Sequence, residues 1–347
     1  MLNKQTSKFL KLSLVLTLSI VLIFIATCRG GHRPDEDRDN RPGGQGSDQQ
    51  ETDQGVEKPD LPDQVRTQDQ TEPRLKVYIA DEGRVEEMAF EEYVAGVVGG
   101  EIKNDWPLEA IKAQAIIART FVLHFIEEKG QSQHADAHVS TDIEEAQAWN
   151  VAAVNDQIKK AVNDTRGQTI VYDGNFARTW FHSNAGGKTA TPTEGLNFQD
   201  EDPPYIQVVD SPDLTESVDE EAKSWSTTFT KAEVIAALKT AGEPVQDFNS
   251  VSISEKGLSG RALRISFDDS EVSAAELRLA IGTTDMRSTL IDNIALEGDR
   301  LLVSGKGYGH GVGMSQWGAY NMAENNKTAE DIINHYYKEI DIVKMWE

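Results

Sequence analysis

The chain has 347 residues, with 58 acidic side chains, 34 basic side chains, a formal net charge of −24 and a single cysteine. This excess of negative charge argues against binding to a nucleic-acid backbone, and one cysteine excludes an intrachain disulfide and a cysteine-rich zinc cluster. With 38% hydrophobic and 27% charged residues, most of the chain is expected to be globular. Residues 75–347 hold 46 of the acidic and 24 of the basic side chains, so the acidity belongs mainly to the expected folded body.

Residues 1–28 are expected to export and anchor the chain. Three lysines precede an almost unbroken apolar run over residues 12–27, which is typical of a secretory signal peptide or of a slightly short transmembrane helix. Cys28 closes this run as in a bacterial lipobox, although Thr27 departs from the small residue preferred before that cysteine. A lipidated Cys28 and an uncleaved span both stay open. Either one places the body at the cell membrane, on its extracytoplasmic face.

Residues 29–74 are predicted to be a disordered acidic linker. Their only large apolar residues are Val56, Leu61 and Val65, whereas Pro, Gly, Gln and Asp dominate. Such a segment cannot bury enough apolar surface to offset the entropy of ordering it. It is therefore expected to act as a flexible spacer between membrane and body.

The first half of the body, which begins at residue 75, is expected to mix helices and strands. A strand is predicted at 75–80, a short helix at 90–98 that Gly99 and Gly100 stop, and a long helix at 107–128. The long helix has apolar residues at spacings of three and four, and Asp105 and Gly130 are its expected caps. A further helix is predicted at 151–163. The Asp-Gly pair at 173–174 predicts the turn of a hairpin that ends near residue 183.

The second half carries clearer helix signals. Capping boxes open helices at Thr230 and Ser273, which Gly242 and Gly282 close, and Thr328 caps a last helix through Tyr337. A second hairpin is predicted over 249–268 and a strand over 301–307. Because no regular βαβ repeat occurs, the fold class is predicted to be α+β. Residues 210–290 hold no recognisable motif and are expected to form a second lobe.

The densest motif is a run of alternating glycines from Gly305 to Gly313. It does not fit the spacing of a phosphate-binding loop. Alternating glycines let a backbone lie closely against a ligand or another strand, with His310 as the one imidazole among them and Ser315 as the cap of a following helix. A ligand site is favoured here over a tight packing corner, because interior glycine weakens a strand and needs a reason.

Two other segments offer chemistry. His182 and Ser183 precede a Gly-Gly turn and resemble a base and a nucleophile, but neighbours on a strand point to opposite faces, so a hydrogen-bonded turn is equally open. Glu101 follows two glycines among apolar residues. If it is buried, its neutral form is favoured, as a general acid requires. On these residues alone, a solvated glutamate at a helix boundary is the better interpretation.

Taken together, three motifs resemble the stage II sporulation protein D family, which includes the amidase enhancers. They are Glu-x-x-x-x-x-Pro-x-Glu-Ala-x-Lys-Ala-Gln-Ala-x-x-Ala-Arg-Thr at 101–120, Phe-His-Ser-x-x-Gly-Gly-Lys-Thr at 181–189, and Gly-x-Gly-His-Gly-Val-Gly-Met-Ser-Gln-x-Gly-Ala at 307–319. The resemblance covers about residues 75–345, and it reverses the interpretation of Glu101.

The resemblance implies a lytic transglycosylase that cleaves peptidoglycan strands between N-acetylmuramic acid and N-acetylglucosamine, forming 1,6-anhydro ends during the engulfment step of sporulation. Glu101 falls on the family's catalytic glutamate. His182, Ser183, Gly187, Tyr308, His310 and Gln316 fall on motif positions and are expected to line the glycan groove. The implied partners are glycan strands, a cell-wall amidase and a membrane scaffold protein, with no nucleic acid.

Two other functions stay open, and no cofactor is expected. The chain could be a non-catalytic wall-binding module that enhances a partner amidase, or a hydrolase that uses His182 and Ser183. Some relatives carry an apparent zinc site of His and Cys residues between the main helix and residue 147. Here Ser140, Glu145 and Ala146 stand where thiols or imidazole are expected. His134, His138 and Glu145 could bind a metal weakly, but solvated surface histidines are the favoured interpretation.

Overall fold

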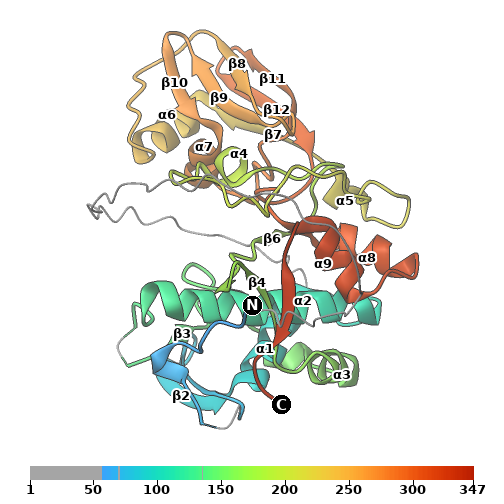
Figure 1. Cartoon of the computed structure of the whole chain (residues 1–347). Helices are drawn as coiled ribbons and strands as arrows, with labels where there is room; N and C mark the ends of the chain where they lie inside the picture. The colour runs from blue at the N-terminus through green and yellow to red at the C-terminus, as the bar shows by residue number, and fades with distance from the viewer. Residues whose placement is uncertain (1–56, 69–70, 135) are drawn as a thin grey trace, which may run out of the picture.

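The computed structural model describes residues 57–68, 71–134 and 136–347. Helices and strands are mixed, which confirms the predicted α+β class. Figure 1 shows two units, a lower one that contains the long helix α2 and an upper one made mainly of strands, with β6, α8 and α9 between them. Among the described residues, none of the helices combines the length and the apolar character needed to cross a membrane. The predicted anchor lies outside the described residues.

Part of the segment predicted to be a linker, residues 57–68 and 71–74, belongs to the described structure. A short 3₁₀ helix spans Asp63–Val65, and Val65 and Leu61 pack on the main hydrophobic core. Lys58 Nζ donates to the carbonyl of Lys344 at 3.1 Å. Two of the three large apolar residues of the segment therefore bury apolar surface against the core.

The lower unit is built on two helices and a small sheet. Strand β1 (Arg74–Ile79) pairs with β2 (Arg84–Ala89) antiparallel and with β3 (Val139–Ser140) parallel. Helix α1 (Phe90–Glu101) follows β2 directly, and α2 (Leu108–Lys129) is nearly buried along one face. Helix α3 (Asp156–Asp164) packs against both helices. Gly130 ends α2 as predicted, with a φ of 77°.

Three local predictions were wrong. Gly99 and Gly100 do not stop a helix, because α1 continues through them to Glu101. A Cβ on Gly100 would lie 2.6 Å from the carbonyl carbon of Ala148, so glycine serves here to let a neighbouring segment approach the helix. The cap of α2 is Pro107, without a side-chain bond, rather than Asp105. The helix predicted over 151–163 is a 3₁₀ turn at Val151–Ala153 followed by α3, whose cap is Asn155.

The upper unit has its own hydrophobic core, formed by residues between Trp225 and Val303. One antiparallel sheet contains β8 (Val251–Lys256), β9 (Ala262–Phe267) and β10 (Ser270–Ser273), which includes the predicted hairpin. The other contains β7 (Ser224–Thr230), β11 (Ile291–Glu297) and β12 (Arg300–Lys306). Helices α6 (Lys231–Thr240) and α7 (Ala274–Ile281) begin at the predicted caps Thr230 and Ser273.

The segments that carry the second and third motifs lie between the two units. Strand β4 (Gln168–Tyr172) turns at Asp173 and Gly174 into β5 (Asn175–Phe176) and also pairs with β14 (Asp341–Lys344). The chain then leaves the hairpin, and β6 (Phe181–His182) pairs in parallel with β13 (Met314–Ser315). Short helices α4 (Pro192–Leu196) and α5 (Glu220–Lys223) follow, while α8 (Gln316–Glu324) and α9 (Ala329–Tyr336) complete the fold.

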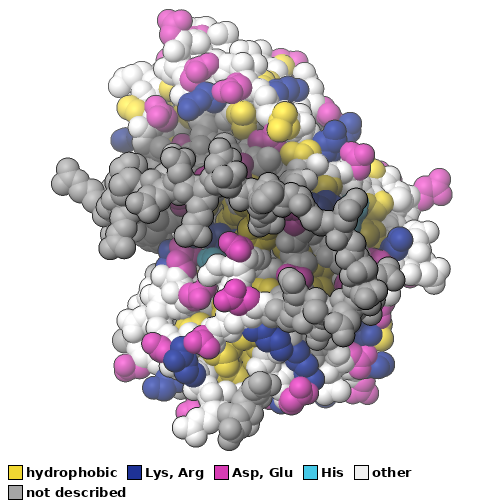
Figure 2. All heavy atoms as spheres, in the orientation of Figure 1, with side chains coloured by type: hydrophobic (Ala, Val, Ile, Leu, Met, Phe, Trp, Pro, Cys, Tyr) yellow, Lys and Arg dark blue, Asp and Glu magenta, His cyan; other side chains and the backbone are white. Residues whose placement is uncertain are grey.

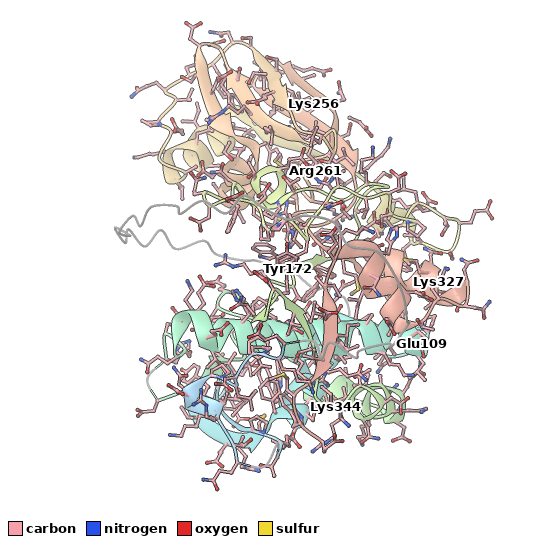
Figure 3. All side chains as sticks on the ribbon, viewed as in Figure 1. Glu109, Tyr172, Lys256, Arg261, Lys327 and Lys344 are labelled. Atoms are coloured by element: carbon pink, nitrogen blue, oxygen red, sulfur yellow. The ribbon has the colours of Figure 1, made fainter. Side chains whose placement is uncertain are left out.

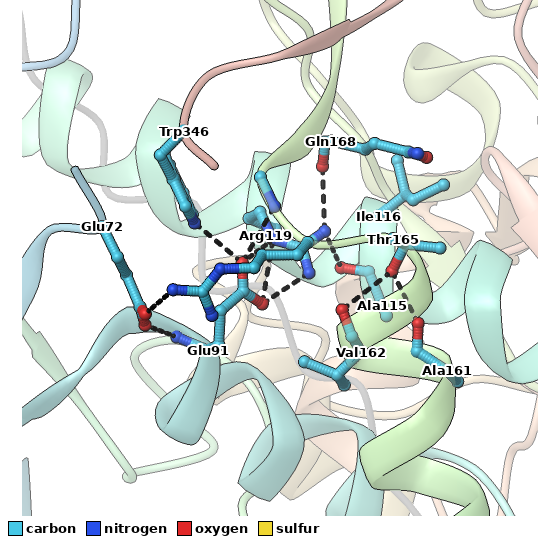
Figure 4. A network of polar contacts seen from close by, with 12 residues as sticks. Glu72, Glu91, Ala115, Ile116, Arg119, Ala161, Val162, Thr165, Gln168 and Trp346 are labelled. Atoms are coloured by element: carbon cyan, nitrogen blue, oxygen red, sulfur yellow. Dashed lines mark hydrogen bonds and ion pairs between the residues drawn. The ribbon is translucent and has the colours of Figure 1, made fainter. Parts of the chain in front are cut away.

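A buried ion pair holds the lower unit together, and Figure 4 shows its network. Arg119 of α2 donates to Glu91 of α1 with Nη2 and Oε2 2.6 Å apart, and both side chains are buried. Glu91 Oε1 also accepts from the indole of Trp346 at 2.9 Å, near the end of the chain. The neighbouring Thr120 hydroxyl accepts from the N–H of Ile170 in β4. The Arg-Thr end of the first motif thus fixes the frame rather than facing a ligand.

Candidate active site

Glu101, the last residue of α1, is a buried carboxyl with one oxygen fixed and the other unpaired. Its side chain is 2% exposed. Oε1 accepts the N–H of Ala148 at 2.7 Å, and Oε2 has no hydrogen-bond partner within the described residues. Burial raises the pKa of the carboxyl to about 8, and the bond from Ala148 opposes that rise in part. Near neutral pH the carboxyl group is therefore mostly protonated.

The glycines of α1 create this geometry. The segment at 148–150 lies against α1, where the N–H of Asn150 donates to the carbonyl of Gly96 at 2.9 Å. Side chains at Gly96 and Gly100 would overlap Trp149 and the backbone of Ala148. Only a helix face without Cβ atoms lets the Ala148 N–H reach the Glu101 carboxyl.

Glu101 lines a cavity of about 860 Å³. One side comes from residues 99–106, a second from residues 219–222 around the start of α5, and a third from Ser183 with Gln316 and Trp317 at the start of α8. Asn150 and Ala153 complete the lining. Trp106 and Trp317 line the cavity and pack with Tyr320 in an aromatic cluster with ring centroids 4.6–5.4 Å apart. Both indoles are largely buried, so only a small part of their aromatic surface faces the cavity.

Gln316 connects the third motif to the first. Its side-chain Nε2 donates to the backbone carbonyl of Glu101 at 2.8 Å and to Gln114 Oε1 at 3.3 Å. Ser315 caps α8 by accepting the N–H of Gly318, as the sequence predicts. The end of α1 and the start of α8 are therefore held together beside the cavity.

The glycine run packs against protein rather than lining this cavity. Gly307, Gly309, Gly311 and Gly313 all have positive φ, between 70° and 111°. A Cβ on Gly313 would lie 1.9 Å from the carbonyl oxygen of Trp180, and one on Gly311 would lie 2.4 Å from the guanidinium carbon of Arg261. The tight packing corner, which the sequence analysis considered less favoured, describes these glycines.

His182 and His310 form a buried pair, with ring centroids 5.6 Å apart. Both use the peptide groups of Val312: His182 Nδ1 donates to its carbonyl at 3.1 Å, and His310 Nδ1 accepts its N–H at 3.0 Å. Burial lowers the pKa of His310 to about 3 and that of His182 well below its usual value, and nearby guanidinium groups add to both shifts. The two rings are neutral and hold opposite tautomers.

The remaining predicted site residues divide between cavity and frame. Ser183 lines the cavity but has no hydrogen bond to His182, as the alternation along a strand implies. Gly187 donates its N–H to Asp213 Oδ1 at 2.7 Å. Tyr308 is buried, and its backbone exchanges two hydrogen bonds with Asn184. Of the seven predicted site residues, Glu101, Ser183 and Gln316 line the cavity, whereas His182, Gly187, Tyr308 and His310 do not.

Asp213, which the sequence analysis missed, joins the second and third motifs. Its fully buried carboxylate accepts hydrogen bonds from two N–H groups and two hydroxyls, all at 2.7–2.8 Å; the donors are Ala185, Gly187, Ser211 and Ser315. Asp213 lies in an irregular segment without periodicity. Only the Ser-x-Asp spacing at 211–213 hinted at a local turn.

Arg261, also missed, fixes the upper unit on the same motifs. Figure 3 labels it at the lower edge of that unit. The side chain is fully buried and donates to the carbonyls of Lys188 at 2.8 Å and Ala185 at 2.7 Å. Burial lowers its pKa to about 10, so the guanidinium remains charged.

Hydrogen bonds and ring stacking engage the side chains that the sequence analysis considered for a metal. Glu145 accepts from the Ser132 hydroxyl at 2.7 Å and from the N–H of Gln133. His134 stacks on Tyr78 with centroids 3.8 Å apart, and His138 Nδ1 accepts the N–H of Lys76. Within the described ranges, no group of three or more His, Cys, Asp or Glu side chains is arranged to hold a metal ion.

Comparison with known proteins gives a consistent set of relatives. The family described as SpoIID, stage II sporulation protein, matches residues 78–172, a range that includes Glu101 and α2. An uncharacterized protein of Brachyspira hyodysenteriae is 32% identical over 260 residues, which cover 75% of this chain and 68% of the relative.

Two named relatives extend the match. The stage II sporulation protein D of Bacillus amyloliquefaciens is 28% identical, with 80% of this chain and 83% of the relative covered. The amidase enhancer of Bacillus subtilis is 26% identical, with 70% of this chain but only 39% of the relative covered.

Proposed function

Since this chain belongs to the stage II sporulation protein D and amidase-enhancer family, we propose that it is a peptidoglycan lytic transglycosylase that acts in sporulation. The observation that carries the proposal is Glu101. It is a buried carboxyl with a pKa raised to about 8, with one oxygen fixed by Ala148 and the other unpaired, at the wall of a large cavity. These are the properties of a general acid near neutral pH.

The proposed reaction uses one carboxyl twice. Glu101 donates its proton to the glycosidic oxygen as the bond to the anomeric carbon of the muramic sugar breaks. The 6-hydroxyl of the same sugar then attacks that carbon and returns its proton to Glu101. The products are a 1,6-anhydro end and a free 4-hydroxyl on the neighbouring sugar. Glycosidases that activate a water need a second carboxylate, whereas an intramolecular hydroxyl supplies its own nucleophile at high effective concentration.

The cavity suits a sugar polymer. Trp106 and Trp317 contribute small aromatic areas to the lining, and Ser183 and Asn150 contribute hydrogen-bonding groups. Gln316 holds the backbone of Glu101, which supports an acid with a fixed position relative to the bound strand. His182 and His310 serve in this proposal as positioning residues, because both are buried outside the cavity lining.

The place of action is part of the proposal. The basic and apolar N-terminal segment, through a span or a lipidated Cys28, would hold the protein at the outer face of the cell membrane. There it would meet glycan strands, a cell-wall amidase and a membrane scaffold protein.

A second candidate is a wall-binding module that enhances an amidase, because one relative carries the name amidase enhancer. The test is digestion of peptide-free glycan strands followed by mass analysis. Anhydro products from wild type and none from Glu101→Gln support the enzyme. Strand binding without products from either form supports the binding module.

A further inference from the structure

The cavity beside Glu101 has a strongly acidic rim. Four carboxylates line it, at Asp105, Asp219, Glu220 and Glu221, against the single ammonium of Lys103. With Glu101 protonated, the charge of the lining is −3. A negatively charged group on a ligand in this cavity would be repelled by these carboxylates.

Within this rim, Lys103 lies between a carboxylate and an aromatic ring. Its Nζ lies 2.9 Å from Asp219 Oδ2 and 4.9 Å from the ring centroid of Trp317. An ammonium is therefore held by a carboxylate on one side and an aromatic face on the other, which is the composition of a cation-binding subsite. Both partners of the ion pair are more than half exposed, so the pair contributes little to stability and is easily exchanged.

A second observation, separate from the ion pair, points to a ligand at the same cavity. Glu101 Oε2 is buried and has no hydrogen-bond partner within the described residues, although the residue lines the cavity. An unpaired buried oxygen costs free energy unless a ligand group reaches it. Glu101, Asp219 and Trp317 line the same cavity, so one bound molecule can reach all three.

We propose that Asp219 and Trp317 form a subsite for a protonated amino sugar, in which the ammonium of Lys103 stands in for the ligand. The preferred substrate would then be a glycan strand with de-N-acetylated glucosamine next to the bond that Glu101 protonates. This inference rests on the proposed function for the identity of the polymer. It adds that the cavity selects strands with free amino groups over fully N-acetylated strands.

The test measures binding in the Glu101→Gln variant, so that cleavage does not interfere. Chitosan hexamer, which carries free amino groups, and chitin hexamer, which carries acetamides, are titrated calorimetrically at low salt and slightly acidic pH. Chitosan hexamer is expected to bind roughly tenfold more tightly. Additional substitution Asp219→Asn should remove most of this preference, while Lys103→Met should strengthen chitosan binding because the internal competitor is gone.

Asp269→Asn is the matched control. It removes one exposed carboxylate from the β9–β10 turn of the upper unit, away from the cavity, and should leave the preference unchanged. Equal binding of the two hexamers, tighter binding of chitin hexamer, or a preference that Asp219→Asn leaves intact would overturn the subsite. A different result would contradict the proposed transglycosylase activity, namely the absence of anhydro products from the wild-type protein.

Discussion

Gln316 donates a hydrogen bond of 2.8 Å to the carbonyl of Glu101, although 215 positions separate the two residues. The bond joins the first residue of α8 to the last residue of α1. The acid is therefore positioned by the third motif as well as by its own helix. This relationship gives the third motif a role at the site that its glycines do not have.

Replacing Gln316 should mainly affect the position of Glu101. Gln316→Ala removes two buried hydrogen bonds and is expected to destabilise the fold by about 2 kcal/mol. The rate of product formation should fall at least roughly tenfold, because small displacements of a catalytic group are costly. Urea denaturation and product analysis measure the two effects. Gln199→Ala, at an exposed loop position, is the control and should change neither.

Asp213 should be important for stability. Asp213→Asn replaces an oxygen that accepts several hydrogen bonds by a donor, so at least one buried donor loses its partner. We expect a loss of roughly 3 kcal/mol in the free energy of unfolding. Asp210→Asn, three residues earlier and highly exposed, should change it by less than about 0.5 kcal/mol. Similar effects of the two substitutions would contradict the role of Asp213 as the link between the motifs.

The glycines of α1 can be tested against helix propensity. Alanine favours a helix over glycine by about 1 kcal/mol, so Gly100→Ala would stabilise an unobstructed helix. Here the added methyl group meets the backbone of Ala148 at 2.6 Å, and we expect a net loss of about 2 kcal/mol. The pKa of Glu101 should rise further, because the hydrogen bond that lowers it is weakened. Thermal unfolding and the pH profile of product formation measure these effects.

The buried histidines should make stability depend on pH. Their folded pKa values lie below that of an unfolded histidine, with His310 at about 3. The unfolded chain thus binds more protons, so the stability they contribute is complete above pH ~6.5 and is lost progressively as pH falls toward ~3. Urea denaturation across this range should show a smaller slope for His310→Gln. An unchanged slope would contradict the burial of a neutral imidazole, and NMR titration of the wild-type rings gives a second test.

The buried Glu101 changes the free energy of unfolding with pH in the opposite direction. Its folded pKa of about 8 lies above the ordinary value of 4.5, so the folded chain binds an extra proton between these limits and stability falls as pH rises through them. At pH ~7 the cost amounts to about 3 kcal/mol. Glu101→Gln should therefore raise the free energy of unfolding near neutral pH. The control Glu92→Gln, at an exposed position of the same helix, should not.

Local signals were enough to predict much of the fold. The caps at Thr230, Ser273, Ser315 and Thr328 were confirmed because each depends on a hydrogen bond within a few residues. Gly99 and Gly100 were misinterpreted because their reason is a segment nearly fifty residues away. Asp105 failed as a cap because Pro107 already sets the start of α2.

The site residues were harder to predict from the sequence than the fold. The residues alone favoured a solvated Glu101, and only the resemblance to a family reversed that interpretation, in agreement with its 2% exposure. Asp213 and Arg261 could not be found because their partners are distant in the sequence and neither belongs to a periodic segment. The glycine run suggested a ligand, but the partners of its glycines are Trp180, Arg261 and other protein groups.

The surface of the protein is acidic. Figure 2 shows acidic side chains spread over both units on the visible face, in keeping with the net charge of −24. The overall negative charge of the protein therefore does not attract a negatively charged ligand. Under the proposed function, recognition of the strand would instead depend on the groups that line the cavity beside Glu101.

The most direct test is product analysis of peptide-free glycan strands treated with wild type, Glu101→Gln and Glu92→Gln across the range from acidic pH to above pH ~8. We predict 1,6-anhydro products from wild type and Glu92→Gln, with activity lost as pH rises through about 8, where Glu101 loses its proton. Glu101→Gln should be slower by at least about 10²-fold. Equal product formation by Glu101→Gln, or no anhydro products from wild type, would contradict the assignment of Glu101 as the catalytic acid.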